Sequence, residues 1–410
     1  MRFIFFSMRD FTHDGGGSIR MYGILNALAQ KGCEVVFISN AKQTNNFHSS
    51  ICHIPINYTF STGQKAIFQF LLSFIPVSII SLFYKSFLKR ISIILNEVIK
   101  NNEKVYFFEY LDNSIAYLLK KNKIISSYIN DIHGVAPVEF EIQVGLAKNI
   151  KSKLLNKFKY LSARLLDKKV FNAGYGFIYP SNKIKEYYEI RALKTQKQSY
   201  IIPYLLSDIS NIVDVSLKKR LQNQFKIQSN TFVFLFAGGY KSTSGVEDLI
   251  ETFKKLYIIY PTIKLILIGS SVSKGCKKMG LGFEQDIIFV DNIPYEKLYT
   301  YQNIANVIVC PDRMNPYSNM IVHLKYFDAL LSGKLVINGN FDSVKEINKE
   351  NSLSLTFESS NINSLYEAMK NCIENYDNLV EKYKDVEKYT KEYLTYSNYI
   401  DVLIDNRNEL

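Results

Sequence analysis

Short apolar runs alternate with amphipathic stretches along most of the chain. Residues 2–8, 33–38 and 104–109 are apolar runs of strand length, and an amphipathic stretch at residues 19–30 separates the first two. The alternation restarts at residues 231–236. Continuous apolar runs of this length are typical of strands that are buried on both faces of a parallel sheet. The pattern predicts an α/β fold in which a second strand–helix series begins near residue 200.

The second series contains a segment, residues 315–340, that has the pattern of a helix, a glycine and a strand. Lys325 and Asp328 lie three apart, so a helix places them on one face. Gly333 offers a helix end, and residues 335–337 form the apolar run of a buried strand. Taken alone, the segment is either a ligand site or an ordinary amphipathic helix with a solvated Lys and Asp.

The length and the cysteines narrow the class of protein. A chain of 410 residues is too long for one typical core, which favours two domains. The five cysteines are scattered and never form a C-x-x-C pair, so they indicate neither a disulfide framework nor a zinc site. The first residues lack the apolar region of a signal peptide. We therefore expect a reducing, cytoplasmic compartment.

The positive charge is concentrated in the first half of the chain. The formal net charge is +12, but residues 1–200 contain 27 Lys and Arg against 13 Asp and Glu, whereas the remaining residues are slightly acidic. A basic half can face nucleic acid, an anionic membrane or a negatively charged substrate. No nucleic-acid-binding motif occurs, so we expect no nucleic acid partner.

Two stretches of the first half bear on membranes. Residues 66–84 are long enough for a membrane span, but Gln69, three serines and Pro76 weaken that interpretation, so buried or interface-dipping helices are favoured. Residues 148–169 combine eight basic residues with one acid, and their apolar residues have helical spacing. This amphipathic basic helix is either a solvated face or a peripheral contact with anionic lipid.

Two polar segments follow predicted strands of the first half. Gly15, Gly16 and Gly17 precede the first helix, where backbone N–H groups can meet an anion, although a flexible turn is the ordinary alternative. Asp131 and His133 follow an apolar strand at the carboxyl edge of the predicted sheet, where α/β folds bind ligands. A core or surface histidine is the alternative for His133.

Together these segments resemble the retaining GT-B glycosyltransferases, especially glycosyltransferase family 4. Residues 325–337 (KYFDALLSGKLVI) are similar to the signature Lys-x-Phe-Glu-Tyr-Met-Ala-x-Gly-Lys-Pro-Val-Ile of that family. Residues 131–137 (DIHGVAP) are similar to its Asp-x-His-Gly-x-x-Pro motif, and Gly15-Gly16 precede residues 32–35 (GCEV) at a matching interval. The resemblance extends over nearly the whole chain.

The resemblance implies the GT-B fold, an α/β fold whose two Rossmann-like domains face each other across a cleft. It implies an acceptor-binding domain at residues 1–198 and a nucleotide-sugar-binding domain at residues 199–388. It also implies a carboxyl-terminal helix, at about residues 389–410, that crosses back to the first domain.

The resemblance also implies donor-binding residues in the second half. Asp328 takes the place of a family Glu that binds the ribose hydroxyls of a sugar nucleotide. Lys325, Lys241 and Gly238 are expected beside the rest of the donor.

In the first half, the resemblance implies that His133 reaches the donor sugar or the acceptor, with Asp131 orienting it or contacting the acceptor. Whether the imidazole acts as a base or only as a hydrogen-bond donor stays open. Gly15, Gly16 and Gly17 would let the chain approach the donor.

Three positions depart from the family pattern. The Arg and Lys that neutralise the donor diphosphate in the family are Gly239 and Ser244 here, so Lys241 is the nearest substitute. A Glu that many members place close to the transferring sugar is Met320 here. Some branches of the family lack that Glu.

We therefore expect an enzyme that transfers a sugar from a nucleotide-sugar to a glycan or lipid-linked acceptor, in bacterial surface polysaccharide synthesis. The resemblance implies retention of the anomeric configuration. No Asp-x-Asp motif occurs, so we expect neither a metal nor another cofactor. The acceptor suggests a site at the inner face of the plasma membrane.

Two alternatives stay open. The departures at Gly239, Ser244 and Met320 fit a non-catalytic protein that binds an acceptor or partners an active transferase. A sugar-nucleotide epimerase of the same fold is the second alternative, which the apolar and basic features of the first half disfavour.

Overall fold

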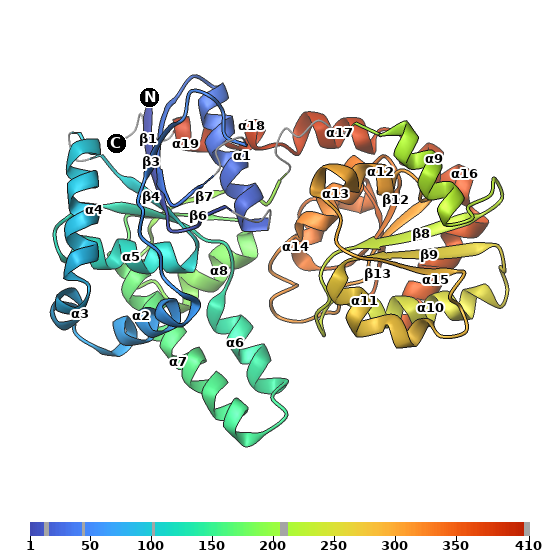
Figure 1. Ribbon diagram of the computed structural model, residues 1–410, viewed down its shortest axis with the longest axis horizontal. Helices are drawn as coiled ribbons and strands as arrows, with labels where there is room; N and C mark the ends of the chain where they lie inside the picture. The colour runs from blue at the N-terminus through green and yellow to red at the C-terminus, as the bar shows by residue number, and fades with distance from the viewer. Residues whose placement is uncertain (12–15, 43–45, 101–102, 206–211, 406–410) are drawn as a thin grey trace. The chain divides into compact units, whose positions relative to one another are not determined.

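The structure, a computed structural model, divides the chain into two compact units (Figure 1). Unit 1 comprises residues Met1–Ser207 and Tyr396–Leu410, and unit 2 comprises Asp208–Thr395. The domain boundaries expected from the sequence, at residues 198 and 388, stay predictions. The residues that the structure describes are 1–11, 16–42, 46–100, 103–205 and 212–405.

Unit 1 is built on a parallel sheet of seven strands in the order β3-β2-β1-β4-β5-β6-β7. The strands are β1 (Arg2–Ser7), β2 (Glu34–Ser39), β3 (Cys52–Pro55), β4 (Val105–Phe108), β5 (Tyr128–Asp131), β6 (Gly176–Tyr179) and β7 (Gln198–Ile201). The order reverses between β1 and β4. In a doubly wound sheet this reversal opens a crevice at the carboxyl ends of the strands.

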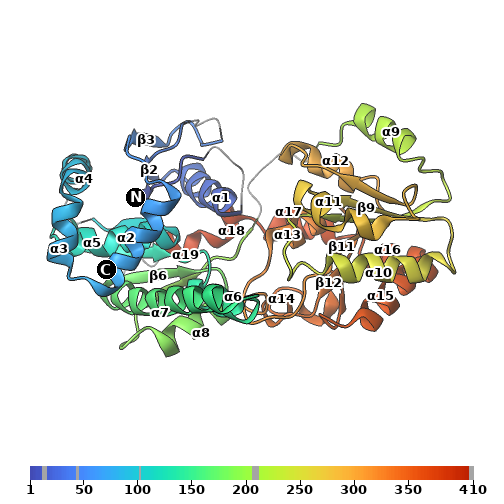
Figure 2. The ribbon, with the colours of Figure 1, turned by 60° about the horizontal axis from the view of Figure 1, so that its bottom comes forward.

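Helices cover the sheet of unit 1 (Figures 1 and 2). They are α1 (Gly16–Gln30), α2 (Thr62–Phe74), α3 (Val77–Phe83), α4 (Lys85–Val98), α5 (Glu109–Lys121), α6 (Ala136–Gly145), α7 (Ile150–Ala173), α8 (Asn182–Arg191), α18 (Tyr396–Tyr399) and α19 (Asp401–Asp405). The apolar stretch at residues 66–84 is divided between α2 and α3 at Pro76, as its sequence favours. Within the described residues, no helix has both the length and the apolar character needed to cross a membrane.

Unit 2 repeats this architecture with a parallel sheet of six strands in the order β10-β9-β8-β11-β12-β13. The strands are β8 (Phe232–Ala237), β9 (Ile263–Ile268), β10 (Ile287–Val290), β11 (Val307–Cys310), β12 (Leu335–Gly339) and β13 (Leu355–Phe357). All six residues of β9 are buried, which explains its apolar residues. Its one charged residue, Lys264, donates to the Gln285 carbonyl at 2.7 Å and pairs with Asp286 at 3.1 Å. Here the order reverses between β8 and β11.

The main helices of unit 2 follow the expected alternation with the strands. They are α9 (Val215–Gln224), α10 (Val246–Tyr257), α11 (Ser270–Cys276), α12 (Leu298–Gln302), α13 (Leu324–Leu331), α14 (Asp342–Lys345), α15 (Ile362–Glu374), α16 (Tyr376–Lys382) and α17 (Val386–Tyr393). The helix–glycine–strand segment is confirmed: α13 ends just before Gly333, whose φ of +65° lies in the left-handed region, and β12 follows.

The last residues return to unit 1 as short helices rather than as one continuous helix. Helix α17 belongs to unit 2, and α18 and α19 belong to unit 1. The buried ring of Tyr396 occupies the space that a Cβ at Gly23 would fill, so α18 packs closely on α1. The Tyr396 hydroxyl accepts a hydrogen bond from the Leu205 backbone N–H at 3.1 Å.

Candidate active site

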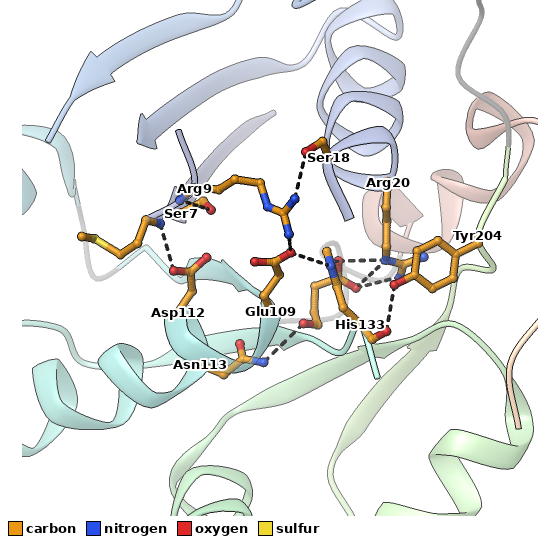
Figure 3. Close-up of polar contacts among 11 residues, drawn as sticks. Ser7, Arg9, Ser18, Arg20, Glu109, Asp112, Asn113, His133 and Tyr204 are labelled. Carbon is orange, nitrogen blue, oxygen red and sulfur yellow. Dashed lines mark hydrogen bonds and ion pairs between the residues drawn. The ribbon is translucent and has the colours of Figure 1, made fainter. Parts of the chain in front are cut away.

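Five charged side chains gather at the carboxyl edge of the sheet of unit 1, and we call them the histidine cluster (Figure 3). Arg9 follows β1, Glu109 directly follows β4, Asp131 ends β5 and His133 follows it, while Arg20 comes from α1. Strands β1 and β4 flank the reversal in strand order, and β5 lies next to β4. The sheet topology thus brings Asp131 and His133 together with three residues that lie far away in the sequence.

The ion pair between Arg20 and Asp131 is fully buried, with both side chains 0% exposed. Arg20 Nη2 lies 2.7 Å from one carboxylate oxygen and Nε lies 2.9 Å from the other. Arg20 Nη1 donates to the carbonyl groups of Ile202, at 2.7 Å, and Pro203, at 2.9 Å. Burial alone would raise the pKa of Asp131, but the charges of Arg20 and His133 outweigh it and lower that pKa. Asp131 is therefore a fixed anion.

His133 lies between two carboxylates. Its Nε2 is 2.7 Å from Asp131 Oδ2, and its Nδ1 is 3.7 Å from Glu109 Oε1. Its backbone carbonyl accepts a hydrogen bond from the Tyr204 hydroxyl at 2.8 Å. Burial disfavours the imidazolium, but Asp131 and Glu109 outweigh this and raise the pKa of His133. The surroundings favour a ring that is protonated on both nitrogens.

Glu109 is held in an unusual backbone conformation. Its φ of +59° lies in the left-handed region, which costs a residue with a Cβ about 1 kcal/mol or more. Its carboxylate pairs with Arg9, which also donates to Ser18 Oγ at 3.0 Å. Burial opposes ionisation, but His133 and Arg9 outweigh it and lower the pKa of Glu109 to about 2. Backbone strain of this kind is typical of residues that are held in place for function.

The three expected glycines fall at the start of α1. Gly17 lies against the histidine cluster, because a Cβ there would be 2.5 Å from Glu109 Oε1 and 3.3 Å from His133 Nδ1. Gly16 is exposed at the first position of the helix. Gly15 lies outside the described residues.

The expected donor-binding residues of unit 2 surround the ends of β8 and β11. Lys325 Nζ lies 2.6 Å from Asp312 Oδ2 and 5.2 Å from the centre of the Phe236 ring. A Cβ at Gly238 would lie 3.8 Å from Lys325 Cδ. The structure therefore brings Gly238 and Lys325 together, and the ammonium group of Lys325 forms an ion pair with the carboxylate of Asp312.

Lys241 is close enough to the same residues for its charge to affect His323, as the charges of Lys325 and Asp312 do. Burial lowers the pKa of His323, the charge of Asp312 opposes this, and the charges of Lys325 and Lys241 lower the pKa further. The charges of both lysines thus act on one half-buried imidazole.

Asp328 lies on the same helix as Lys325 but has a different partner. The Tyr295 hydroxyl donates to Asp328 Oδ1 at 2.5 Å. Burial raises the pKa of Asp328 to about 7, although this hydrogen bond lowers it. Asp328 can therefore accept hydrogen bonds as a carboxylate or donate one as an acid near neutral pH.

The loop before α10 differs from the expected cation-bearing loop for a structural reason. The buried Ser244 hydroxyl donates to the Lys241 carbonyl at 2.8 Å and closes a tight turn. Gly245 has a φ of +65°, and a Cβ there would overlap the carbonyl oxygen of Pro311. Gly239 leaves room instead, because a Cβ there would lie 4.0 Å from its nearest neighbour, Ser271 Oγ. Lys241 is the cation that the turn itself carries. Arg313 also reaches the turn, where its Nη1 donates to the Ser242 carbonyl at 2.8 Å, but it is paired with Asp248.

Sequence reasoning singled out neither Glu109, Arg9 nor Arg20 in unit 1, nor Asp312 and Tyr295 in unit 2. Position after a strand was an available signal for Glu109, Arg9 and Asp312, since each follows an apolar run. Across the ranges that the structure describes, no group of three or more His, Cys, Asp and Glu side chains is arranged to hold a metal ion.

Replacement of Arg20 tests the buried ion pair. In Arg20→Met, Asp131 would keep a buried charge without its guanidinium partner, so we expect unfolding free energy to fall by about 3–5 kcal/mol. Urea unfolding of the purified protein measures this. Arg20→Lys, which keeps the charge but cannot form the paired contacts, should lose less. A loss below about 1 kcal/mol in Arg20→Met would contradict a central role for the pair.

Comparison with known proteins places this geometry in context. Residues 218–393 match the family model "Glycosyl transferases group 1". No protein with curated function matches the chain in sequence. The family match therefore covers most of unit 2, including Gly238, Lys241, Lys325 and Asp328.

Solved structures resemble the whole chain in fold. The sucrose-phosphate synthase of Thermosynechococcus elongatus has a TM-score of 0.72 at 16% identity, covering 100% of this chain and 98% of that one. HepE of Anabaena, solved in complex with UDP and glucose, has a TM-score of 0.69 at 13% identity, covering 100% of both chains. A glycosyltransferase of Rickettsia africae has a TM-score of 0.67 at 16% identity, covering 100% of this chain and 98% of that one. The chain thus has the α/β fold of GT-B glycosyltransferases, and its unit 2 matches the group 1 family.

Proposed function

We propose that this protein is a glycosyltransferase that moves a sugar from a nucleotide-sugar to a glycan or lipid-linked acceptor. The observation that carries the proposal is the match of residues 218–393 to the group 1 family, because those residues contain the lysines and Asp328 of unit 2. The solved relative that holds UDP and glucose supports a nucleotide-sugar as the donor.

In this proposal, unit 2 holds the donor. Asp328 accepts hydrogen bonds from the ribose hydroxyls, and Lys325 and Lys241 face the diphosphate. During transfer, the acceptor hydroxyl oxygen forms a bond to the anomeric carbon while the bond between that carbon and the diphosphate breaks. The electron pair of the broken bond leaves with the diphosphate, and the proton of the acceptor hydroxyl passes to the departing diphosphate oxygen. The departing charge must be stabilised by cations and backbone N–H groups, and we propose that no metal is needed. Family 4 membership and retention of configuration are part of the same proposal.

The histidine cluster is then the catalytic group of unit 1. A protonated His133 between Asp131 and Glu109 suits donation of a hydrogen bond to the sugar or acceptor better than removal of a proton. Asp131, already bound by Arg20, orients the ring. Glu109 remains the anion closest to the exposed edge of the cluster, with its side chain 25% exposed.

The non-catalytic alternative is favoured by one specific observation. Asp312 Oδ2 lies 2.6 Å from Lys325 Nζ, and this carboxylate offsets the positive charge that would bind a diphosphate. With Gly239 and Ser244 in place of the family cations, the loop of unit 2 is also poor in positive charge. Such a protein would bind a nucleotide or an acceptor without turnover.

The proposal is tested by nucleotide release from UDP-, GDP-, ADP- and dTDP-sugars, with and without a bacterial lipid extract. We expect release from one donor, stimulated by the extract and unchanged by EDTA. Release without any acceptor dependence, together with a changed free sugar nucleotide, would indicate an epimerase. If no sugar nucleotide releases its nucleotide while UDP binds in a titration, the non-catalytic alternative would be favoured.

Two variants separate donor binding from transfer. Asp328→Ala should lose most nucleotide affinity, about tenfold or more, because a buried polar partner of the ribose is removed. His133→Ala should slow transfer about 100-fold with little change in nucleotide affinity. Titration calorimetry and initial rates measure the two effects. Unchanged donor binding in the first variant, or full turnover in the second, would remove that residue from the site.

We also propose that unit 1 attaches to anionic membrane from the cytoplasmic side, as surface polysaccharide synthesis in a bacterium would require. Helix α7 packs against α2 and α6, and α6 and α7 extend together away from the sheet of unit 1 (Figure 1). Their exposed apolar side chains include Ile67, Phe70 and Phe74 of α2 and Ile150, Leu154, Leu155, Phe158, Leu161 and Leu165 of α7. Basic residues lie between those of α7, a combination that suits a lipid surface of negative charge.

Charge reversal on α7 tests the attachment. Lys153→Glu with Lys157→Glu should weaken binding to vesicles containing phosphatidylglycerol by at least about 30-fold. Each basic residue near such a surface contributes about 1 kcal/mol, and the two new carboxylates are repelled in addition. Sedimentation with vesicles measures this. Lys219→Glu with Arg220→Glu on α9 changes the net charge equally and serves as the control. Equal losses in the two variants, or no binding by the unmodified protein, would contradict the proposal.

A further inference from the structure

A partly open cavity of about 630 Å³ extends from the histidine cluster into unit 1. Its walls come from the end of β1 and from α2, α5, α6 and α7, and Glu109 and His133 lie on its lining. Asp112, Asn113 and Asp167 also line it. A cavity of this size has room for a small ligand beside the candidate catalytic group.

Three buried polar side chains of the cavity lack a partner for one oxygen. Asp112 is 2% exposed, Asn113 is 5% exposed and Asp167 is 4% exposed. Asp112 Oδ2, Asn113 Oδ1 and Asp167 Oδ2 each accept no hydrogen bond. Buried polar atoms are nearly always paired in proteins, so three unpaired oxygens on one cavity point to hydrogen-bonding groups on a ligand.

The other polar atoms of Asp112 and Asn113 are fixed by the fold. Asp112 Oδ1 accepts the Met8 backbone N–H at 2.9 Å, and Asn113 Nδ2 donates to the Asp131 backbone carbonyl at 3.3 Å (Figure 3). Asn113 is thereby tied to the strand that carries the histidine cluster. A ligand bound here would be positioned directly relative to His133.

Asp167 is conspicuous in the sequence of α7. It is the single acid among residues 148–169, which contain eight basic residues. The basic residues of α7 lie mainly on its exposed side, whereas Asp167 is buried toward the cavity. An ion pair with these basic residues therefore does not explain why an acid occupies position 167.

The charge of the cavity disfavours one class of ligand. Besides Asp112 and Asp167, its lining carries the acids Asp10, Glu109 and Glu139 against the cations Arg9 and Lys65 and the imidazole of His133. Burial raises the pKa of Asp112 and Asp167 to about 8, so the remaining positive and negative groups balance. An anionic group, such as a phosphate or a carboxylate, would find no excess of positive charge here.

The protonation of the buried acids suits a neutral ligand. Burial and the charge of Glu109 raise the pKa of Asp112 to about 8. Burial raises the pKa of Asp167 to about 8, although a hydrogen bond with Tyr188 lowers it. A carboxylic acid that is neutral at pH 7 both donates and accepts a hydrogen bond, as a sugar hydroxyl does. The aromatic rings of Phe171 and Tyr188 add apolar faces to the same cavity.

We propose that this cavity binds an uncharged sugar ring, the acceptor of the transfer, through Asp112, Asn113 and Asp167, with one ring hydroxyl facing His133. The inference rests on the proposed function and adds the chemical class of the acceptor. Asp112, Asn113 and Asp167 are then the residues that determine acceptor specificity.

Binding of small sugars to the full chain tests the proposal, with and without saturating UDP. The probes are methyl glucoside, methyl galactoside and methyl mannoside, with methyl glucuronide as an anion of matched size and glucosamine as a cation. We expect one uncharged methyl hexoside to bind, as saturation-transfer NMR detects, and at least tenfold weaker binding of methyl glucuronide. Tighter binding of methyl glucuronide or glucosamine, or no binding of any methyl hexoside, would overturn the proposal.

Variants at Asp167 test the residue itself. Asp167→Asn keeps a donor and an acceptor and should retain hexoside affinity within threefold, whereas Asp167→Leu should lose at least tenfold. Glu186→Leu, on the exposed face of α8, makes the same change outside the cavity. Equal affinities in Asp167→Leu and Glu186→Leu, with both folded by thermal unfolding, would exclude Asp167 from the site. The comparison of probes on the unmodified protein decides the proposal even if Asp167→Leu does not fold.

A parallel UDP titration separates the two proposals. UDP binding without hexoside binding would overturn the acceptor cavity and leave the transferase proposal standing. Hexoside binding without binding of any nucleotide-sugar would overturn the transferase proposal, because the donor site belongs to unit 2.

Discussion

The buried ion pair between Arg20 and Asp131 joins three parts of unit 1 that are distant in the sequence. Arg20 comes from α1 and Asp131 from the end of β5. The remaining N–H groups of the Arg20 guanidinium donate to the carbonyl groups of Ile202 and Pro203, which follow β7. Removing two charges from water is costly, and the paired contacts offset that cost only when the geometry is complete. The pair therefore makes the position of Asp131, and through it that of His133, depend on the correct packing of the whole amino-terminal sheet.

The same topological rule operates once in each unit. A doubly wound parallel sheet reverses its strand order at one point. The loops that follow the two strands at that point run to opposite sides of the sheet and leave a crevice between them. In unit 1, Glu109 and His133 meet beside this reversal, and in unit 2, Gly238 and Asp312 follow the two strands that flank it. Each unit thus has its own group of polar residues, built from its own strands.

The sequence predicted the parts of the fold that depend on local pattern. The strands β1, β2 and β4 are buried on both faces, so their apolar runs marked them within one residue at each end. Asp131 and His133 could be proposed as site residues from the sequence because they are close together in one motif. The partners of that motif could not be found in this way: Arg20 lies 111 residues from Asp131, and the contact exists only after the sheet has formed. The left-handed conformation of Glu109 likewise has no signal in its residue type, since glycine and asparagine are the residues that usually adopt it.

The return of the last residues to unit 1 bears on how the chain folds during synthesis. Tyr396 packs on Gly23 and accepts a hydrogen bond from Leu205, so a piece that follows unit 2 in the chain completes the core of unit 1. Domains generally fold in the order of their synthesis, which would put unit 1 first. The piece that completes unit 1, however, leaves the ribosome only after unit 2. The face of helix α1 around Gly23 therefore stays uncovered until unit 2 and Tyr396 have emerged. The first unit to begin folding is the last to be finished.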